Sequence, residues 1–333
     1  MSVHLRVDAE DLLRCRFAVS PLWETVAAVR TLADPRRQAY HLPWLKRVHD
    51  RVDAAVLEPL LALLPNTGYT PDFLTPPPVG PLENFGDELA RVAATPIDHV
   101  ADELGRSLTG PERGDPAEPE VVARLLADPV RTLDELVAVL HGCWTTLLAD
   151  EWPALRDLLD NDIAVRSRHL ANGGLRQLMA NLHHTVRWDD GVLRVAAPYR
   201  MSKNLGGQGL LLMPSAFVWP ATTVVVEPPW QPTLIYPVRG IDELWRRPAP
   251  QSDRALRRLV GRTRADILIN LDEAASTTAL GRLHDVSPAT VSGHLAALRD
   301  AGLVVGHRVG YTVLYERTGL GSALCGKRPG VEP

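Results

Sequence analysis

The chain has 333 residues, enough for two domains with their own cores, and its 45% hydrophobic and 23% charged residues are ordinary for a globular protein. Its net charge of −4 argues against a surface coated for nonspecific nucleic-acid binding. The sequence shows no signal peptide and no apolar run of about 20 residues, so we expect a cytoplasmic protein without membrane contacts.

The first 250 residues predict a mainly helical region that ends in a sheet. Alternation over residues 1–8 indicates a short strand, and helical periodicity dominates residues 9–182. Over residues 184–237 the period changes to two, and alternating runs around Asp190 and Gly191 predict a hairpin. We expect a four- or five-stranded antiparallel meander here, which makes the fold class α+β.

Motifs that carry chemistry are missing from this region. The three cysteines of the chain are too far apart for a local metal or redox motif. His183 and His184 are adjacent, and neighbours in a strand point to opposite faces, so they are poorly placed to share an ion. The Gly-rich residues 206–209 lack the Lys-Ser/Thr of a phosphate loop. We therefore expect no enzyme activity, no cofactor and no metal site.

The eight tryptophans are the remaining feature of the composition. Trp188, Trp219 and Trp230 fall in the predicted sheet, and the other five fall in or beside predicted helices. We expect most of them in the core. The alternative, that some line a pocket for a small apolar effector, stays open.

A Pro-rich segment at residues 247–250 marks the expected domain boundary, so we predict domains at 1–250 and 251–325 and a tail at 326–333. From residue 251 onward there are 11 basic and 8 acidic residues, a net charge of +3, whereas the first 250 residues carry 25 and 32, a net charge of −7. Such an asymmetry is expected when one domain faces phosphate and the other does not.

The stretch STTALGRLHDVSPATVSGHLAALRDAG, which ends at Gly302, predicts two short helices joined by a tight turn. Ser276 is the expected N-cap of the first helix, and Leu280 and Leu283 are expected to face inward. This helix should break around Asp285, and Val286 should fill the turn.

In the second helix, Ser287 is the expected N-cap, Pro288 takes the first position and Gly302 ends the helix. One face of this helix is an apolar stripe made by Val291, Leu295 and Leu298. The opposite face carries small and polar side chains: Ala289, Thr290, Ser292 and Gly293. Such a face lets a helix enter a major groove, although a plain surface helix of an all-α domain is the alternative.

Two β-prone runs, 303–305 and 313–315, flank the residues 307–311 and predict a hairpin. Upstream, residues 256–271 read as one long, Arg-rich amphipathic helix. The order helix, helix-turn-helix, hairpin is that of a winged helix. The phrase SPATVSGHLAALRDAGLV followed by a hairpin resembles the ArsR class of bacterial winged helix-turn-helix repressors.

The region before it resembles an uncharacterised domain that precedes the winged helix in actinobacterial ArsR-like regulators, through phrases such as RFAVSPLWETVAAVR, GYTPDFLTPPPVGPL and PPWQPTLIYPVRG. This resemblance implies a regulatory setting and no established ligand. Metal-sensing members place Cys-x-Cys near the first motif helix or His, Asp and Glu pairs on a C-terminal helix. Those residues are missing here, so we expect no metal sensing.

The resemblance implies a sequence-specific, nucleoid-associated transcriptional regulator, expected to be a repressor, with the helix at 287–299 in the major groove of double-stranded DNA. The expected DNA-contacting residues are Thr277, Thr278, Ser287, Ala289, Thr290, Ser292, Gly293, His294, Arg308 and Tyr311. Gly293 departs from the family pattern, in which a larger polar residue often stands, and this removes a base contact. Arg308 and Tyr311 belong to the wing and should reach the backbone or the minor groove.

We expect a homodimer, because one recognition helix contacts few base pairs. The N-terminal domain should supply dimer contacts, an effector pocket, or both. The alternative is an enzyme or ligand-binding protein whose winged helix serves protein–protein contacts. A polar cleft with paired carboxylates in residues 1–250 would favour that alternative.

Overall fold

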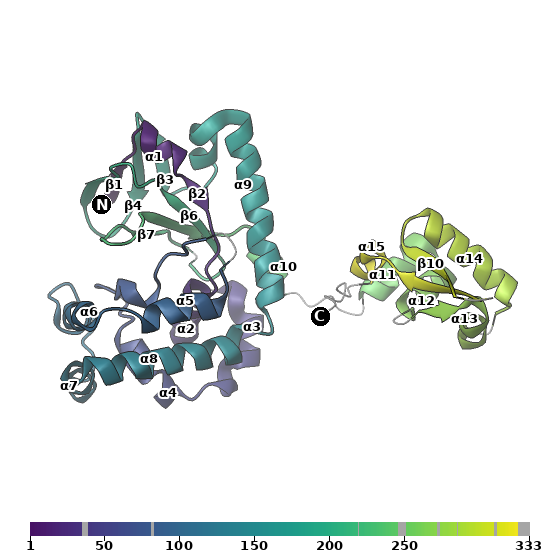
Figure 1. Ribbon diagram of the computed structural model, residues 1–333, viewed down its shortest axis with the longest axis horizontal. Coiled ribbons are helices and arrows are strands. Elements are labelled where there is room, and N and C mark those ends of the chain that lie inside the picture. Colours follow the sequence, from purple (N-terminus) through teal and green to yellow (C-terminus); the bar gives the residue numbers. More distant parts are fainter. Residues whose placement is uncertain are drawn as a thin grey trace. The chain divides into compact units, whose positions relative to one another are not determined.

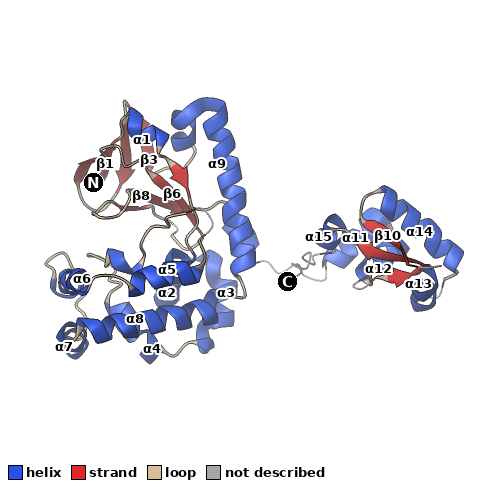
Figure 2. Ribbon diagram, in the orientation of Figure 1, coloured by secondary structure: helices blue, strands red, loops and turns tan. Residues whose placement is uncertain are grey.

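The computed structural model describes residues 1–34, 39–80, 83–218, 220–245, 251–271, 274–284, 286–309 and 312–325. The chain forms two compact units, Met1–Trp245 and Arg246–Pro333, which are considered separately (Figure 1). Both units contain helices and strands, and the fold class is α+β as expected (Figure 2). In the part of the chain described, no helix has the length and apolar character needed to cross a membrane.

The first unit is mainly helical. Its helices are α1 (Ala9–Leu13), α2 (Pro21–Ala33), α3 (Leu42–Val48), α4 (Ala54–Ala62), α5 (Phe85–Ala93), α6 (Ile97–Thr109), α7 (Pro119–Ala127), α8 (Pro129–Cys143), α9 (Trp152–Ala180) and α10 (Ile241–Leu244). Short turns of other helical types are η2 (Ala39–His41), η3 (His49–Arg51), η4 (Asp72–Leu74) and the π-helical η5 (Trp144–Leu148).

Two four-stranded sheets complete this unit. Their strands are β1 (Ser2–Arg6), β2 (Arg16–Phe17), β3 (Val186–Asp189), β4 (Val192–Ala196), β5 (Met201–Asn204), β6 (Leu211–Ser215), β7 (Thr223–Val225) and β8 (Thr233–Pro237). One sheet has the order β3-β4-β1-β5 and the other β2-β6-β8-β7. In the second sheet β2, β6 and β8 run parallel, and β7 is antiparallel to β8. All five residues of β6 and of β8 are buried, as expected for parallel strands covered on both faces.

Helix α9 runs beside both the sheets and the helical layer, as Figure 1 shows. Near its start, Leu155 and Leu159 belong to the helical core. Near its end, Leu178 and Met179 belong to a second core, shared with residues of both sheets. The helix therefore contributes to both of these cores.

The expected antiparallel meander over residues 184–237 is wrong. The hairpin at Asp190-Gly191 is confirmed, with both residues at positive φ, but the strands divide between two mixed sheets. Strand β1 pairs with β4 on one side and with β5 on the other, and its Val3 and Leu5 are buried. The N-terminal residues thus complete a sheet formed almost 200 residues later in the chain.

Helix α1 ends at Leu13. The main-chain N–H of Arg16 donates to Leu210 O (3.1 Å) and that of Ala18 to Leu212 O (3.2 Å), so the chain continues as β2, which pairs with β6. Helix α9 is broken at Gly173 and Gly174, whose φ angles are −146° and +65°.

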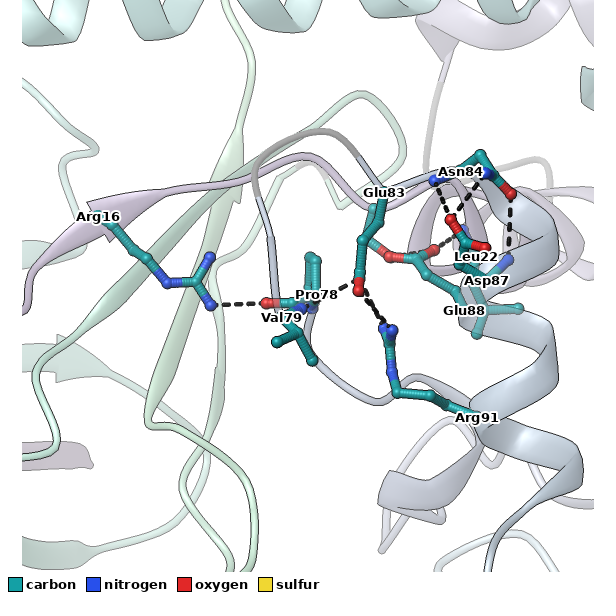
Figure 3. A network of polar contacts seen from close by, with 10 residues as sticks. Arg16, Leu22, Pro78, Val79, Glu83, Asn84, Asp87, Glu88 and Arg91 are labelled. Carbon is teal, nitrogen blue, oxygen red and sulfur yellow. Dashed lines mark hydrogen bonds and ion pairs between the residues drawn. The ribbon is translucent and has the colours of Figure 1, made fainter.

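A polar network joins the Pro-rich loop before α5, which includes Pro78 and Val79, to the rest of the first unit (Figure 3). The Glu83 carboxylate accepts two hydrogen bonds from the Arg91 guanidinium, at 2.7 and 2.8 Å, and one from Val79 N at 3.0 Å. Arg16 of β2 donates to Pro78 O at 2.6 Å. The loop is therefore fixed between β2 and α5.

Glu88, beside that network, has a fully buried carboxylate (Figure 3). Its Oε2 accepts from Ser20 Oγ at 3.0 Å and from Leu22 N at 2.7 Å, which joins α5 to the first turn of α2. Burial raises the pKa of Glu88 from 4.5 to about 8. Glu24, equally buried, accepts from Ala216 N, and its pKa is raised to about 8 for the same reason.

The second unit consists of α11 (Gln251–Val260), α12 (Arg262–Ile269), β9 (Ala275–Ser276), α13 (Thr277–His284), α14 (Pro288–Asp300), β10 (Val304–Val309), β11 (Thr312–Arg317) and α15 (Gly319–Leu324). Its sheet has the order β10-β11-β9, and the predicted hairpin is confirmed as β10 and β11. The single long helix expected over residues 256–271 is wrong. Gly261, at φ +89°, separates α11 from α12.

Candidate nucleic-acid interface

Two small residues shape helix α13: Ser276 caps its start, and Gly281 allows it to pack closely against the turn that follows. Ser276 Oγ accepts from Ala279 N at 3.2 Å, which confirms Ser276 as the capping residue. Gly281 faces the turn, where Val286 N donates to Gly281 O at 3.0 Å and a Cβ on Gly281 would lie 2.8 Å from Val286 O. Only glycine permits this close approach of helix and turn.

The sequence prediction for the inward face of α13 is half right. Leu280 is buried, whereas 63% of Leu283 is exposed. Because the helix turns Leu280 and Gly281 toward its neighbours, Leu283 falls on the open side. Val286 packs against the core as predicted, and Asp285 lies outside the described residues.

Helix α14 is capped at both ends as its sequence predicts. Ser287 Oγ accepts from Thr290 N at 3.1 Å and shares a 2.8 Å hydrogen bond with Thr290 Oγ1, and Pro288 occupies the first turn. Past the other end, Gly302 has φ +72°, and its N–H donates to Arg299 O at 2.8 Å. The caps at these two ends set the length of the helix, and no residue in the middle of the helix takes part in them.

The two faces of α14 differ as predicted. Its buried residues are Val291, Leu295 and Leu298, which join a core with α12 and α13. The exposed positions include Ala289, Thr290, Ser292 and Gly293. No atom lies within 4 Å of a Cβ built on Gly293, so this face is slim as well as open. A helix with such a face can approach base edges closely.

The remaining predicted contact residues have mixed positions. Thr278 and Arg308 are exposed, whereas Thr277 and His294 are half-buried. Tyr311 lies outside the described residues. The structure therefore places Thr278 among the exposed residues, as it does those of α14, and leaves Thr277 and His294 partly exposed.

A hollow of about 430 Å³ lies where α13 meets the start of α14. It is lined by Thr278, Gly281, Arg282, Val286, Ser287 and Pro288. The exposed guanidinium of Arg282 makes no hydrogen bond or ion pair with the described residues, and the hydroxyls of Thr278 and Ser287 lie beside it. A cation, two hydroxyls and the start of a helix, where main-chain N–H groups lack helical partners, are together suited to a phosphate group.

Arg282 is absent from the residues expected from the sequence. A signal existed, since Arg282 follows Thr278 by four residues and a helix places such residues on one face. The contacts predicted for α13 lie only in its first turn, and none was predicted for the rest of its exposed face.

The hairpin places polar residues on its exposed side. Strands β10 and β11 pair from Val304 with Arg317 to Val309 with Thr312. His307 Nε2 lies 3.0 Å from Glu316 Oε1 across this hairpin. Arg308 is exposed next to His307 in the sequence.

Two short helices in a tight turn, a core behind the second one and a β-hairpin after it define a helix-turn-helix domain with a wing, which indicates a DNA-binding regulator. Residues 262–307 match the family model of a helix-turn-helix domain. Residues 101–242 match that of a family of unknown function, DUF5937. Neither the curated proteins nor the solved structures contain a match to the chain.

The adjacent histidines of the first unit are arranged differently from the prediction. His183 and His184 precede β3 rather than lie in it, and their rings are 4.1 Å apart. His183 Nδ1 shares a 2.7 Å hydrogen bond with Thr185 Oγ1. Across the described ranges of the chain, no three His, Cys, Asp or Glu side chains are grouped so as to hold a metal ion.

Proposed function

We propose that the chain is a transcriptional repressor of the ArsR-like winged-helix class that reads DNA with the exposed face of α14. The observation that carries this proposal is the slim face of Ala289, Thr290, Ser292 and Gly293, bordered by the hollow at Arg282. Ser292 and Thr290 approach the base edges, and the hollow accepts a phosphate of the flanking backbone.

The repressor works as a homodimer in this proposal. One recognition helix of 13 residues covers few base pairs, and a second copy doubles the contact by using a half-site one helical turn, about 34 Å, away. Two-fold pairing also predicts a pseudo-palindromic operator. Equilibrium sedimentation of the full chain gives the oligomeric state, and a footprint gives the half-site spacing.

The Met1–Trp245 unit has a regulatory rather than a catalytic role in this proposal. Its closest approach to paired carboxylates is at Asp72, whose pKa is raised to about 7 by burial and by the charge of Glu103. Both groups are engaged in the fold: Tyr69 Oη donates to Asp72 at 3.2 Å, and Glu103 accepts from Phe73 N at 3.0 Å. Such bonds favour a structural use of the pair.

A salt titration of DNA binding tests the proposal. Fluorescence anisotropy with labelled DNA from the promoter next to the chain's own gene should show tight binding that weakens as salt rises. Arg282→Ala should reduce the slope of log K against log salt by about 1, because one phosphate contact is lost. The matched control Arg168→Ala removes an exposed cation from α9 and should leave the slope unchanged.

Absence of binding at low salt would overturn the proposal. Equal slopes for Arg282→Ala and Arg168→Ala would remove Arg282 and its hollow from the interface.

A further inference from the structure

The Met1–Trp245 unit contains a cavity of about 470 Å³ at the end of β8. Its lining comes from α9, from the residues after α9, from the loop after β8 and from η2: Arg166, Asn181, Leu182, His183, Pro237, Val238, Arg239, Gly240, Ile241 and Tyr40. This volume lies within the range of about 300–1,000 Å³ usual for small-molecule sites. Among the described residues of the lining there is no tryptophan, in contrast to the effector pocket considered from the sequence.

The position of the cavity in the fold favours a ligand site. Strands β6 and β8 are parallel neighbours, and the lining residues 237–241 run from the last residue of β8 to the first residue of α10. In sheets with parallel strands, ligands bind at the carboxyl ends, where the chain leaves the sheet and main-chain groups are exposed. Gly240, at φ +83°, makes the turn that opens this edge.

The charged residues in the lining are all basic. Arg166 and Arg239 contribute guanidinium groups and His183 contributes an imidazole, while Arg166 is paired with the buried Asp162; among the described residues no Asp or Glu belongs to the lining. Burial lowers the pKa of His183, and the neighbouring His184 and Arg166 lower it further, which indicates a positive potential at this position.

Arg166 is a fixed donor rather than a mobile one. Its side chain is 1% exposed, and it donates to Asp162 Oδ2 at 3.3 Å, to Leu182 O at 3.2 Å and to Asn181 O. A guanidinium has five N–H donors, so these three bonds leave two for another acceptor. A planar donor held in this way matches the geometry of a carboxylate.

The rest of the lining is apolar, with Leu182, Pro237, Val238 and Ile241 beside the basic groups. An inorganic anion would leave these side chains unused. We infer that the cavity binds a small organic carboxylate with an apolar body, and that this ligand regulates DNA binding by the second unit. The second half of this inference rests on the proposed function, whereas the first half does not.

Calorimetry on the full chain tests the binding site directly. The probes are acetate, phenylacetate, octanoate, the neutral phenylacetamide and inorganic phosphate. Phenylacetate or octanoate should bind at least about tenfold more tightly than acetate, phosphate and the amide, since only they combine both features. Arg239→Gln should weaken that binding about tenfold, because it removes the exposed guanidinium of the lining. The control Arg168→Gln changes an exposed arginine of α9 outside the lining and should bind as the wild type does.

Failure of both apolar carboxylates to bind would overturn the inference. Equal binding of phenylacetamide or of phosphate would overturn the assignment of the ligand class, and unchanged binding by Arg239→Gln would overturn the assignment of the cavity. Binding that leaves the affinity for DNA unchanged would overturn the regulatory half alone. Loss of DNA binding in every condition would instead contradict the proposed function, and the calorimetric result would stand.

Discussion

The two units of the chain place their polar residues in opposite ways. The Met1–Trp245 unit buries Glu24, Glu88, Asp162 and Arg166: the two glutamates accept from main-chain N–H groups and a hydroxyl, and Asp162 pairs with Arg166. In the described part of the second unit the fully buried residues are almost all apolar, and the hydroxyls and arginines lie on the surface. Buried polar groups make the first unit sensitive to substitution and to pH, whereas exposed ones leave the second unit free to bind.

Replacement of Trp44 by alanine should give the largest effect and should break only the first unit. The ring is fully buried, lies 4.9 Å from Phe217 between centroids, and donates through Nε1 to Leu147 O at 3.2 Å. We expect a loss of about 3–5 kcal/mol in the free energy of unfolding of this unit. Differential scanning calorimetry should show one transition shifted and the other unchanged.

The matched control is Leu13→Ala, because 86% of Leu13 is exposed. A shift of both transitions by Trp44→Ala would show that the two units unfold together. The contrast in stability between the two units would then not hold.

Glu88→Gln should reduce a pH dependence of the first unit that Glu88 shares with Glu24. The folded state raises the pKa of Glu88 from 4.5 to about 8, so between these values the folded state holds a proton that the unfolded chain releases. Stability from this group is therefore complete below about pH 4.5 and is lost as pH rises toward 8, by on the order of 1 kcal/mol per pH unit. Glutamine keeps an acceptor for Ser20 and Leu22 without the charge and should make this slope shallower, while Glu24 keeps its own contribution.

Urea unfolding of the first unit at several pH values, followed by tryptophan fluorescence, gives the measurement. Glu120→Gln, at an exposed position of α7, should keep the wild-type slope. A Glu88→Gln protein with the wild-type slope would assign the pH dependence to another buried group.

Ser287→Ala should weaken the second unit by about 1 kcal/mol, because the hydrogen bond from Thr290 N to Ser287 Oγ is lost. Hydrogen exchange of the α14 amides measures this loss without a contribution from the first unit. Ser292→Ala, in the middle of the same helix, provides the control and should leave the exchange rates nearly unchanged. Equal effects of the two variants would contradict the capping role.

Gly293→Ala should have a small effect on stability. It tests most specifically whether DNA approaches α14 closely. Nothing lies within 4 Å of the added Cβ, and alanine favours a helix by about 1 kcal/mol over glycine, so α14 should become more stable. If close approach to DNA requires this slim face, the affinity for DNA should fall at the same time. A gain in both stability and affinity would show that the groove does not approach Gly293.

The second unit was largely predictable because its signals are local. Ser276 and Ser287 cap their helices, Gly302 ends α14, and the apolar stripe of Val291 is buried, all as the neighbouring residues indicate. The exposure of Leu283 was not predicted, because an exposed leucine on a short helix has the same periodicity as a buried one. Arg282 was not predicted as a contact residue, because its role depends on the start of α14, which only the fold places beside it.

The first unit was predictable only in its helices and in one hairpin. The partners of β1 are about 190 to 200 residues away, and nothing in the pattern of residues 2–6 specifies them. The cavity at β8 has the same origin, because Arg166 and Arg239 come together only after the sheet forms. The residues of such a site carry ordinary sequence contexts, so no motif marks them.

The most direct measurement is the affinity of Ser292→Glu for DNA from the promoter next to the chain's own gene, compared with that of the wild type at fixed salt. Ser167→Glu introduces the same charge at an exposed position of α9 and serves as the control. If α14 reads DNA with its exposed face, Ser292→Glu should bind at least about tenfold more weakly, since a carboxylate replaces a hydroxyl against the groove, while Ser167→Glu binds normally and both proteins unfold as the wild type does. Equal affinities of the two variants for DNA would contradict the account.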